Sequence, residues 1–193
     1  MKREDIYRVF SNIPTLQTER LNLRRLMVAD AEDMFEYSKN KEVTEYLTWD
    51  AHPDVMYTRE YLEYLGGHYN IGDFFDWAVV LVGEDKMIGT CGFTRFDYNN
   101  NSGEIGYVIN PAYWGQGIAQ EAVNAVMEFG FETLNLHRIE AKFIMGNTAS
   151  MRVMEKSGMQ FEGYSREAML IKGEYKTIGV FSILKDEFLH KAY

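Results

Sequence analysis

The chain has 193 residues, of which 46% are hydrophobic and 25% charged, and its formal net charge is −9. This composition is that of a folded globular protein, so we expect residues 1–193 to form a single domain, with residues 1–13 as an N-terminal extension. The negative charge disfavours nucleic-acid binding, which needs cations to neutralise phosphates; it suits cationic partners such as amines or basic peptides, or serves solubility alone.

Membrane and metal functions are also disfavoured. No stretch approaches the roughly 20 apolar residues that span a bilayer, and the first residues lack an apolar signal segment, so a cytoplasmic protein is predicted. Cys91 is the only cysteine and lies in a strand-like apolar run, which favours a buried inert thiol over a nucleophile. The four histidines lack ligand spacing, so we predict no metal site.

The first half of the chain predicts a strand, two helices and then hairpins. Residues 18–26 alternate as a half-buried strand does. Residues 29–40 predict a helix with Asp30 as a cap candidate, and residues 53–67 predict a second helix that ends at Gly66-Gly67. Residues 76–96 predict two strands around a turn, and residues 104–110 predict a third strand. Residues 44–54 and 66–77 are rich in aromatic and acidic side chains and are candidate walls of an acceptor pocket.

The second half predicts a helix from Ile118, a strand over 138–144, a short helix over 147–158 and two strands around Lys172-Gly173. The predicted order is therefore β-α-α-β-β-β-α-β-α-β-β. Such an order indicates an α/β fold with helices on both sides of a central mixed sheet.

Two glycines stand where the helix from Ile118 begins. A helix start offers unpaired N–H groups and a partial positive charge, and it can hold an anion if the backbone comes close. Gly115 and Gly117 leave room for that approach and permit unusual dihedral angles. The main-chain N–H groups of Gly115, Gln116, Gly117, Ile118 and Ala119 are thus candidates to bind a pyrophosphate, although a ligand-free connection would use the same glycines.

Three motifs in sequence resemble one family. They are GEIGYVINPAYWGQGIAQEAV, RIEAKFIMGNTASMRVMEKSGM and EGYSREAMLIKGEYKTIGVFSIL, with LQTERLNLRRL before them. Together they resemble the GNAT superfamily of acyl-CoA-dependent N-acetyltransferases, and within it the Rim-type enzymes that acetylate the N-termini of ribosomal proteins. The resemblance runs from about Thr15 to about Leu184 and implies the GNAT fold, with a mostly antiparallel mixed sheet.

The resemblance also implies a site for acetyl-CoA. The family's phosphate signature falls on residues 114–119, with Trp114 where a polar residue is usual. Tyr107, Val108 and Ile109 would lie on a splayed strand that pairs with the pantetheine arm, and a free amide near Val108 to Ile109 would stabilise the oxyanion. These three residues are equally suited to a core strand.

Asn147 is predicted to cap the helix over 147–158, with Ser150 at its third position. The resemblance gives Asn147 a contact with the cofactor arm and brings Ser150 near the thioester sulfur. Many family members carry a tyrosine one turn later as general acid, whereas this chain has Met154, which cannot donate a proton. Ser150 or water is then the candidate donor.

Glu104 is the candidate general base, since Rim-like enzymes often carry a catalytic glutamate here; an exposed strand-end carboxylate is the alternative. The sequence thus predicts an acetyl-CoA-dependent N-acetyltransferase without a metal, acting on a primary amine, with a protein N-terminus as the favoured acceptor. Small amines such as polyamines, amino acids or aminoglycosides are the alternative acceptor, and a non-catalytic acyl-CoA-binding module is the alternative class. Exposed sheet edges would permit a homodimer.

Overall fold

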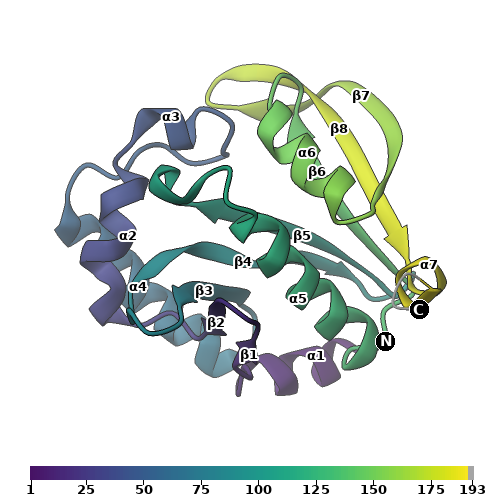
Figure 1. The fold of residues 1–193 in the computed structure, drawn as a ribbon, viewed down its shortest axis with the longest axis horizontal. Helices are drawn as coiled ribbons and strands as arrows, with labels where there is room; N and C mark the ends of the chain where they lie inside the picture. Colours follow the sequence, from purple (N-terminus) through teal and green to yellow (C-terminus); the bar gives the residue numbers. More distant parts are fainter. Residues whose placement is uncertain (191–193) are drawn as a thin grey trace.

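The computed structural model describes residues 1–190 and contains one eight-stranded sheet between two layers of helices (Figure 1). The strand order is β1-β2-β3-β4-β5-β6-β8-β7. Every neighbouring pair is antiparallel except β5 and β6, which run parallel. The predicted fold class, a mixed and mostly antiparallel sheet flanked by helices, is confirmed.

The strands and helices have the following bounds. The strands are β1 Leu16–Gln17, β2 Leu21–Arg24, β3 Phe75–Leu81, β4 Met87–Asp97, β5 Ser102–Ile109, β6 Arg138–Ile144, β7 Gln160–Ile171 and β8 Glu174–Leu184. The α-helices are α1 Arg3–Phe10, α2 Ala31–Ser38, α3 Lys41–Thr44, α4 Val55–Ile71, α5 Ile118–Glu132, α6 Thr148–Lys156 and α7 Lys185–His190. Two short 3₁₀ helices, η1 Val28–Asp30 and η2 Pro111–Tyr113, complete the described elements.

Each face of the sheet buries its own core. On one face, α1, α5 and α6 cover a large cluster that includes Trp77 and Phe131. On the other face, α2 and α4 cover a smaller cluster that includes Tyr37 and Tyr69. Burial of such apolar side chains is the main force that holds the layers together. Cys91 lies fully buried in the larger cluster, as predicted, and burial raises the pKa of its thiol well above the usual value.

The only parallel pair of the described sheet is also incomplete. β5 pairs with β6 from Ser102 to Ile105, and no pairing follows for the last four residues of β5. β6 continues to Ile144 against β8 instead. The two strands therefore separate, which leaves the backbone groups of residues 106–109 without a partner on β6. Figure 1 shows α5 crossing in front of β4 and β5 near this separation.

The structure extends the predicted second helix and adds three helices. α4 runs through Gly66-Gly67 and ends at Gly72, which has a φ of 85°. Glycine costs a helix interior only about 1 kcal/mol, and Tyr69 beyond the pair is fully buried, so packing outweighs this cost. The prediction that the helix ends at Gly66-Gly67 is therefore wrong.

The unpredicted helices are α1, α3 and α7. α1 lies within the predicted N-terminal extension, yet it is part of the core. Phe10 is fully buried, with its ring centroid 5.0 Å from that of Phe75 and 5.4 Å from that of Trp77. None of the helices within residues 1–190 combines the length and apolar character that crossing a membrane requires. β1 and β7 form the two edges of the sheet, and the homodimer stays a prediction.

Candidate active site

The glycine loop adopts the conformation that an anion site needs. Gly115 and Gly117 have φ values of 75° and 78°, and Gly117 is the N-cap of α5. A Cβ added to Gly115 would meet no atom within 4 Å, so its left-handed backbone, rather than crowding, requires glycine there. Within residues 1–190, no acceptor bonds the N–H groups of residues 115–119. These amides are thus free to bind a ligand, and their role stays a prediction.

An arginine that the sequence analysis did not identify braces this loop. Arg20 donates from Nη1 to the carbonyl oxygen of Gln116 at 2.9 Å and from Nε to Glu121 at 2.6 Å. Thr18 also donates to Glu121, at 2.5 Å. Burial raises the pKa of Glu121, but the hydrogen bonds from Thr18 and Arg20 outweigh it and lower the pKa overall. These hydrogen bonds hold the loop in place and put the guanidinium of Arg20 beside Gly117. No sequence motif indicates them, because Arg20 and Gln116 lie 96 residues apart.

The free edge of β5 begins where the strands separate. Asn110 donates its N–H to Ile88 on β4, at 2.7 Å. Since bonded positions alternate in an antiparallel pair, the N–H groups of Tyr107 and Ile109 point away from β4, toward the gap. Trp114 donates from its indole to the carbonyl oxygen of Ile109 at 2.6 Å, so this unusual residue fixes the end of the free edge. Of the predicted oxyanion donors, the alternation favours Ile109 over Val108.

The start of α6 faces the same gap. Asn147 caps the helix, as predicted, by accepting the Ser150 N–H at 3.0 Å. The Tyr107 hydroxyl lies 2.8 Å from Ser150 Oγ and also donates to the Ser150 carbonyl at 3.0 Å. Burial raises the pKa of Tyr107 well above its usual value, although its bond with Ser150 lowers it slightly. Met154 is buried in the core, so its thioether lies away from any site.

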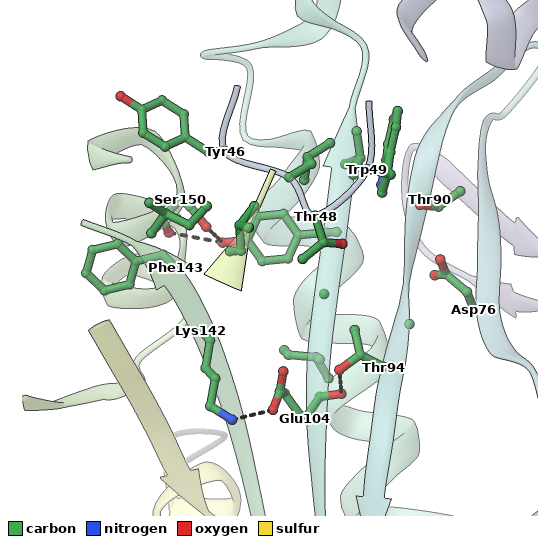
Figure 2. Close-up of a pocket in the computed structure, with 18 of the residues that line it drawn as sticks. Tyr46, Thr48, Trp49, Asp76, Thr90, Thr94, Glu104, Lys142, Phe143 and Ser150 are labelled. Atoms are coloured by element: carbon green, nitrogen blue, oxygen red, sulfur yellow. Dashed lines mark hydrogen bonds and ion pairs between the residues drawn. The ribbon is translucent and has the colours of Figure 1, made fainter. Parts of the chain in front are cut away.

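A cavity of about 850 Å³ extends from the gap between β5 and β6 to the face of the sheet that α2 and α4 cover (Figure 2). Glu104 lines it and is mostly buried, with 17% of its side chain exposed. Its Oε2 accepts hydrogen bonds from Lys142 at 2.6 Å and Arg95 at 2.8 Å. No group within residues 1–190 donates to its Oε1. One carboxylate oxygen is thus held by cations, while the other is free to accept a proton.

The cavity brings together some of the predicted residues and leaves others outside. Glu104, Tyr107, Val108, Asn147 and Ser150 line it. Residues 109 and 115–119 do not, because the glycine loop lies at the outer end of the free strand edge. This division fits a ligand whose phosphates and reactive end are far apart.

The candidate pocket walls from the sequence line the cavity too. Residues 46–53 and 73–76 both contribute, and Figure 2 shows Trp49 and Thr48 on the loop above the sheet. Asp76 lies beside Thr90, away from Glu104. Burial raises the pKa of Asp76 to about 7, although Thr90 and the Trp77 N–H favour its ionised form. The sequence analysis included Asp76 in the candidate wall of residues 66–77 but did not single it out, because no motif distinguishes it from other strand-end acids.

No group of three or more histidine, cysteine, aspartate or glutamate side chains among residues 1–190 could hold a metal ion. His52 is buried against Thr58, with 2.8 Å between Nδ1 and Oγ1, and burial lowers its pKa. Among residues 1–190, the groups available for chemistry include the Glu104 carboxylate and the unpaired backbone N–H groups of residues 115–119.

Comparison with known proteins agrees with this geometry. Residues 20–160 match the acetyltransferase (GNAT) domain. The N-acetyltransferase p20 of Bacillus licheniformis is 36% identical over 174 residues, which cover 90% of this chain and 98% of the relative. The chain belongs to the GNAT family. A GNAT-family acetyltransferase structure from Bacillus anthracis has a TM-score of 0.80 and 32% identity, covering 90% of this chain and 99% of that one. The GNAT protein described here is thus an acetyl-CoA-dependent N-acetyltransferase.

Two relatives with named acceptors point in different directions. The spermidine N(1)-acetyltransferase of Vibrio cholerae is 25% identical over 172 residues, covering 89% of this GNAT chain and 97% of the relative. The ribosomal-protein-serine acetyltransferase of Escherichia coli is 28% identical over 103 residues, covering 53% and 58%. The family and reaction are shared, whereas the acceptor differs between relatives.

Proposed function

We propose that this enzyme transfers the acetyl group of acetyl-CoA to the N-terminal α-amino group of a protein, such as a ribosomal protein. The observation that carries the proposal is the separation of β5 from β6, which opens onto a cavity where Glu104 presents a free oxygen. The free amides of residues 115–119 would hold the pyrophosphate, and the open edge of residues 107–109 would pair with the pantetheine arm, with Asn147 beside it.

The reaction needs no covalent enzyme intermediate. The neutral amine attacks the thioester carbonyl carbon, a C–N bond forms, and the carbonyl oxygen gains negative charge. The N–H of Ile109 is the proposed donor to that oxygen. Glu104 Oε1 takes the proton from the amine, directly or through water. Collapse of the intermediate breaks the C–S bond and releases a thiolate.

The thiolate takes its proton from the hydroxyl pair of Ser150 and Tyr107. Their oxygens lie 2.8 Å apart, so Tyr107 can pass a proton to Ser150 as Ser150 gives its own. Water then returns a proton to Tyr107, and Glu104 releases the proton of the amine to water. This pair takes the role of the tyrosine that many family members carry at the position of Met154. A thiol has a pKa of about 8.5, so the demand on this donor is modest near neutrality.

An α-amino group suits this machinery because its pKa is about 8, against about 10.4 for a lysine side chain. At neutral pH roughly a tenth of α-amines are already uncharged. The similarity to a ribosomal-protein acetyltransferase supports the same acceptor class. A small amine is the second candidate, and it is favoured by the acidic and aromatic lining around Asp76 and by the similarity to a spermidine acetyltransferase.

The test is a panel of acceptors incubated with acetyl-CoA and analysed by mass spectrometry. It contains peptides with free N-termini, the same peptides with blocked N-termini and an internal lysine, polyamines and aminoglycosides. We expect acetylation of the free N-termini and none of the blocked peptides. Turnover of small amines with none of the N-terminal peptides would reject the protein acceptor and leave the second candidate.

A further inference from the structure

The wall of the cavity away from Glu104 contains a bare strip of sheet that ends at a carboxylate. Asp76 on β3 pairs with Gly92 on β4, and Gly92 pairs with Gly106 on β5. A Cβ on Gly92 would lie 2.7 Å from Asp76 Oδ1, so glycine is required for this close approach. Neighbouring strands lie about 4.8 Å apart, which puts Asp76 roughly 10 Å across the sheet from β5. Between them the sheet carries no side chain in that row.

The charge of Asp76 has no compensating cation. Within residues 1–190 it takes part in no ion pair, and its Oδ1 accepts the Trp77 N–H at 3.1 Å. Protein surrounds the carboxylate on most sides, yet part of its surface is open to the cavity. A largely enclosed carboxylate without a cation is costly, and a cation that entered the cavity would reduce this cost.

A hydroxyl group without a hydrogen-bond partner also lines this cavity. Tyr37 is only 1% exposed, and its hydroxyl oxygen has no hydrogen-bond partner within residues 1–190. Both Tyr37 and Tyr61 line the cavity. Burial raises the pKa of both phenols, and the charge of Asp76 is the next largest cause for each. Tyr37, Tyr61 and Asp76 thus line one cavity, and a buried hydroxyl without a partner, such as that of Tyr37, is unusual because such groups are normally paired.

We propose that Asp76 and Tyr37 form a second subsite of the acceptor pocket, which binds an ammonium group other than the amine that is acetylated. The carboxylate supplies the counter-charge, the phenol oxygen of Tyr37 accepts a hydrogen bond, and the rings of Tyr61 and Trp49 offer faces for a cation. The proposal rests on the proposed function, because it takes the cavity to be the acceptor site.

The position of the subsite sets the spacing of the two nitrogen atoms. The Asp76 side chain and the ammonium bound to it together take up part of the roughly 10 Å between Asp76 and β5. This leaves a distance on the order of 6 Å between that ammonium nitrogen and an acceptor nitrogen beside β5. A five-carbon diamine reaches this spacing with its chain slightly bent, and so does a peptide whose N-terminal α-amine is accompanied by a nearby lysine side chain. Both sources offer the same chemistry, and the experiment separates them.

The first experiment compares acceptors that differ only in the distal charge. One pair is 1,5-diaminopentane and pentylamine; the other is a peptide with lysine at its second position and the same peptide with norleucine. We expect kcat/KM to favour the charged member of at least one pair by at least about 30-fold, a typical value for a charge-assisted contact. The pair that shows the preference identifies the source.

The variant Asp76→Asn is expected to reduce that preference to less than about threefold while CoA affinity stays unchanged. Asp50→Asn is the matched control, because Asp50 lines the rim of the same cavity with its side chain 87% exposed. It should keep the preference. No preference in the native protein, or an undiminished preference in Asp76→Asn, would overturn the subsite.

Tyr37→Phe separates binding from folding. Removing a buried hydroxyl that has no partner should leave the melting temperature equal or higher, while KM for the charged acceptor rises about tenfold and that of the uncharged one does not. An equal change in both KM values would indicate a merely structural tyrosine and count against the subsite.

Binding provides a test without turnover. Calorimetry should show that the CoA-loaded protein binds 1,5-diaminopentane or the lysine peptide more tightly than the uncharged counterpart, and that Asp76→Asn loses the difference. If only the diamine pair shows it and no peptide is acetylated, the subsite stands and the protein-acceptor proposal fails. If neither charged ligand binds more tightly, the subsite is rejected whatever the acetylation panel shows.

Discussion

The proposed cofactor half and the proposed acceptor half of this site are built in different ways. The proposed cofactor half consists mainly of one continuous stretch, from β5 to the loop at residues 115–119, and it offers mainly backbone amides, with Asn147 and Ser150 of α6 beside it. The acceptor half is assembled from side chains of α2, α4, β3 and the loop before α4, which lie far apart in the sequence. A backbone site depends on local conformation, whereas a side-chain site depends on the whole fold.

The sharpest way to break the cofactor half is Gly117→Asp. Its φ of 78° strains any other residue, and the carboxylate would add negative charge beside the phosphates. We expect CoA affinity to fall by about 100-fold or more, measured by calorimetry.

Gly83→Asp is the control for that variant. Gly83 has a φ of 88° and free space around it, but it lies in the turn between β3 and β4. It should show similar backbone strain and unchanged CoA affinity. Equal affinity losses in both variants would attribute the effect to strain and remove the phosphate role from the loop.

Glu104→Gln tests the chemistry at the border between the halves. It removes the proposed base with little change in shape, so we expect kcat to fall by about 100-fold with CoA affinity unchanged. Glu140→Gln is the matched control, since Glu140 shares Arg95 and Lys142 with Glu104 but does not line the cavity. If the two variants retained the same activity, Glu104 would not be the base.

The effect of Ser150→Ala should be smaller. The Asn147 cap binds the Ser150 backbone N–H, so the variant keeps α6 intact and loses only the hydroxyl. We expect kcat to fall about tenfold, because water can still protonate a thiolate whose pKa is about 8.5. Thr148→Ala, at the first residue of the same helix, is the control variant, and both variants are compared by steady-state kinetics. Unchanged kcat in Ser150→Ala would remove Ser150 as the proton donor.

The same contrast explains what the sequence could predict. Gly115, Gly117 and the Asn147 cap follow from rules that act over a few residues, and the structure has the predicted local conformations there. The strands other than the two-residue β1, which was not predicted, were recognisable because their apolar spacing is regular. Local rules failed where packing decides, as at Gly66-Gly67, where burial of Tyr69 keeps the helix going.

Other features have no local signal at all. Arg20 contacts the glycine loop only because β2 lies beside α5, and its contact with Gln116 spans 96 residues. Asp76 and Tyr37 face one cavity from different elements, and neither stands in a motif. Such residues become visible only when the sheet order is known, since that order decides which distant segments meet.

The last prediction uses the acceptor half alone and concerns stability. The pKa of Asp76 rises from an ordinary 3.8 to about 7 on folding, because burial opposes its charge. Between these pH values the folded protein holds a proton that the unfolded chain has lost, so stability falls as pH rises from about 4 to about 7 and is level above. Asp76→Asn has no proton to lose, so its melting temperature should exceed that of the native protein by several degrees at pH 8 and by less than half as much at pH 5. Asp50→Asn, on the exposed rim, should show no such growth with pH. A gain of equal size at pH 5 and pH 8 would mean that the charge of Asp76 does not destabilise the folded protein. The argument that this carboxylate lacks a cation in the acceptor half would then fail.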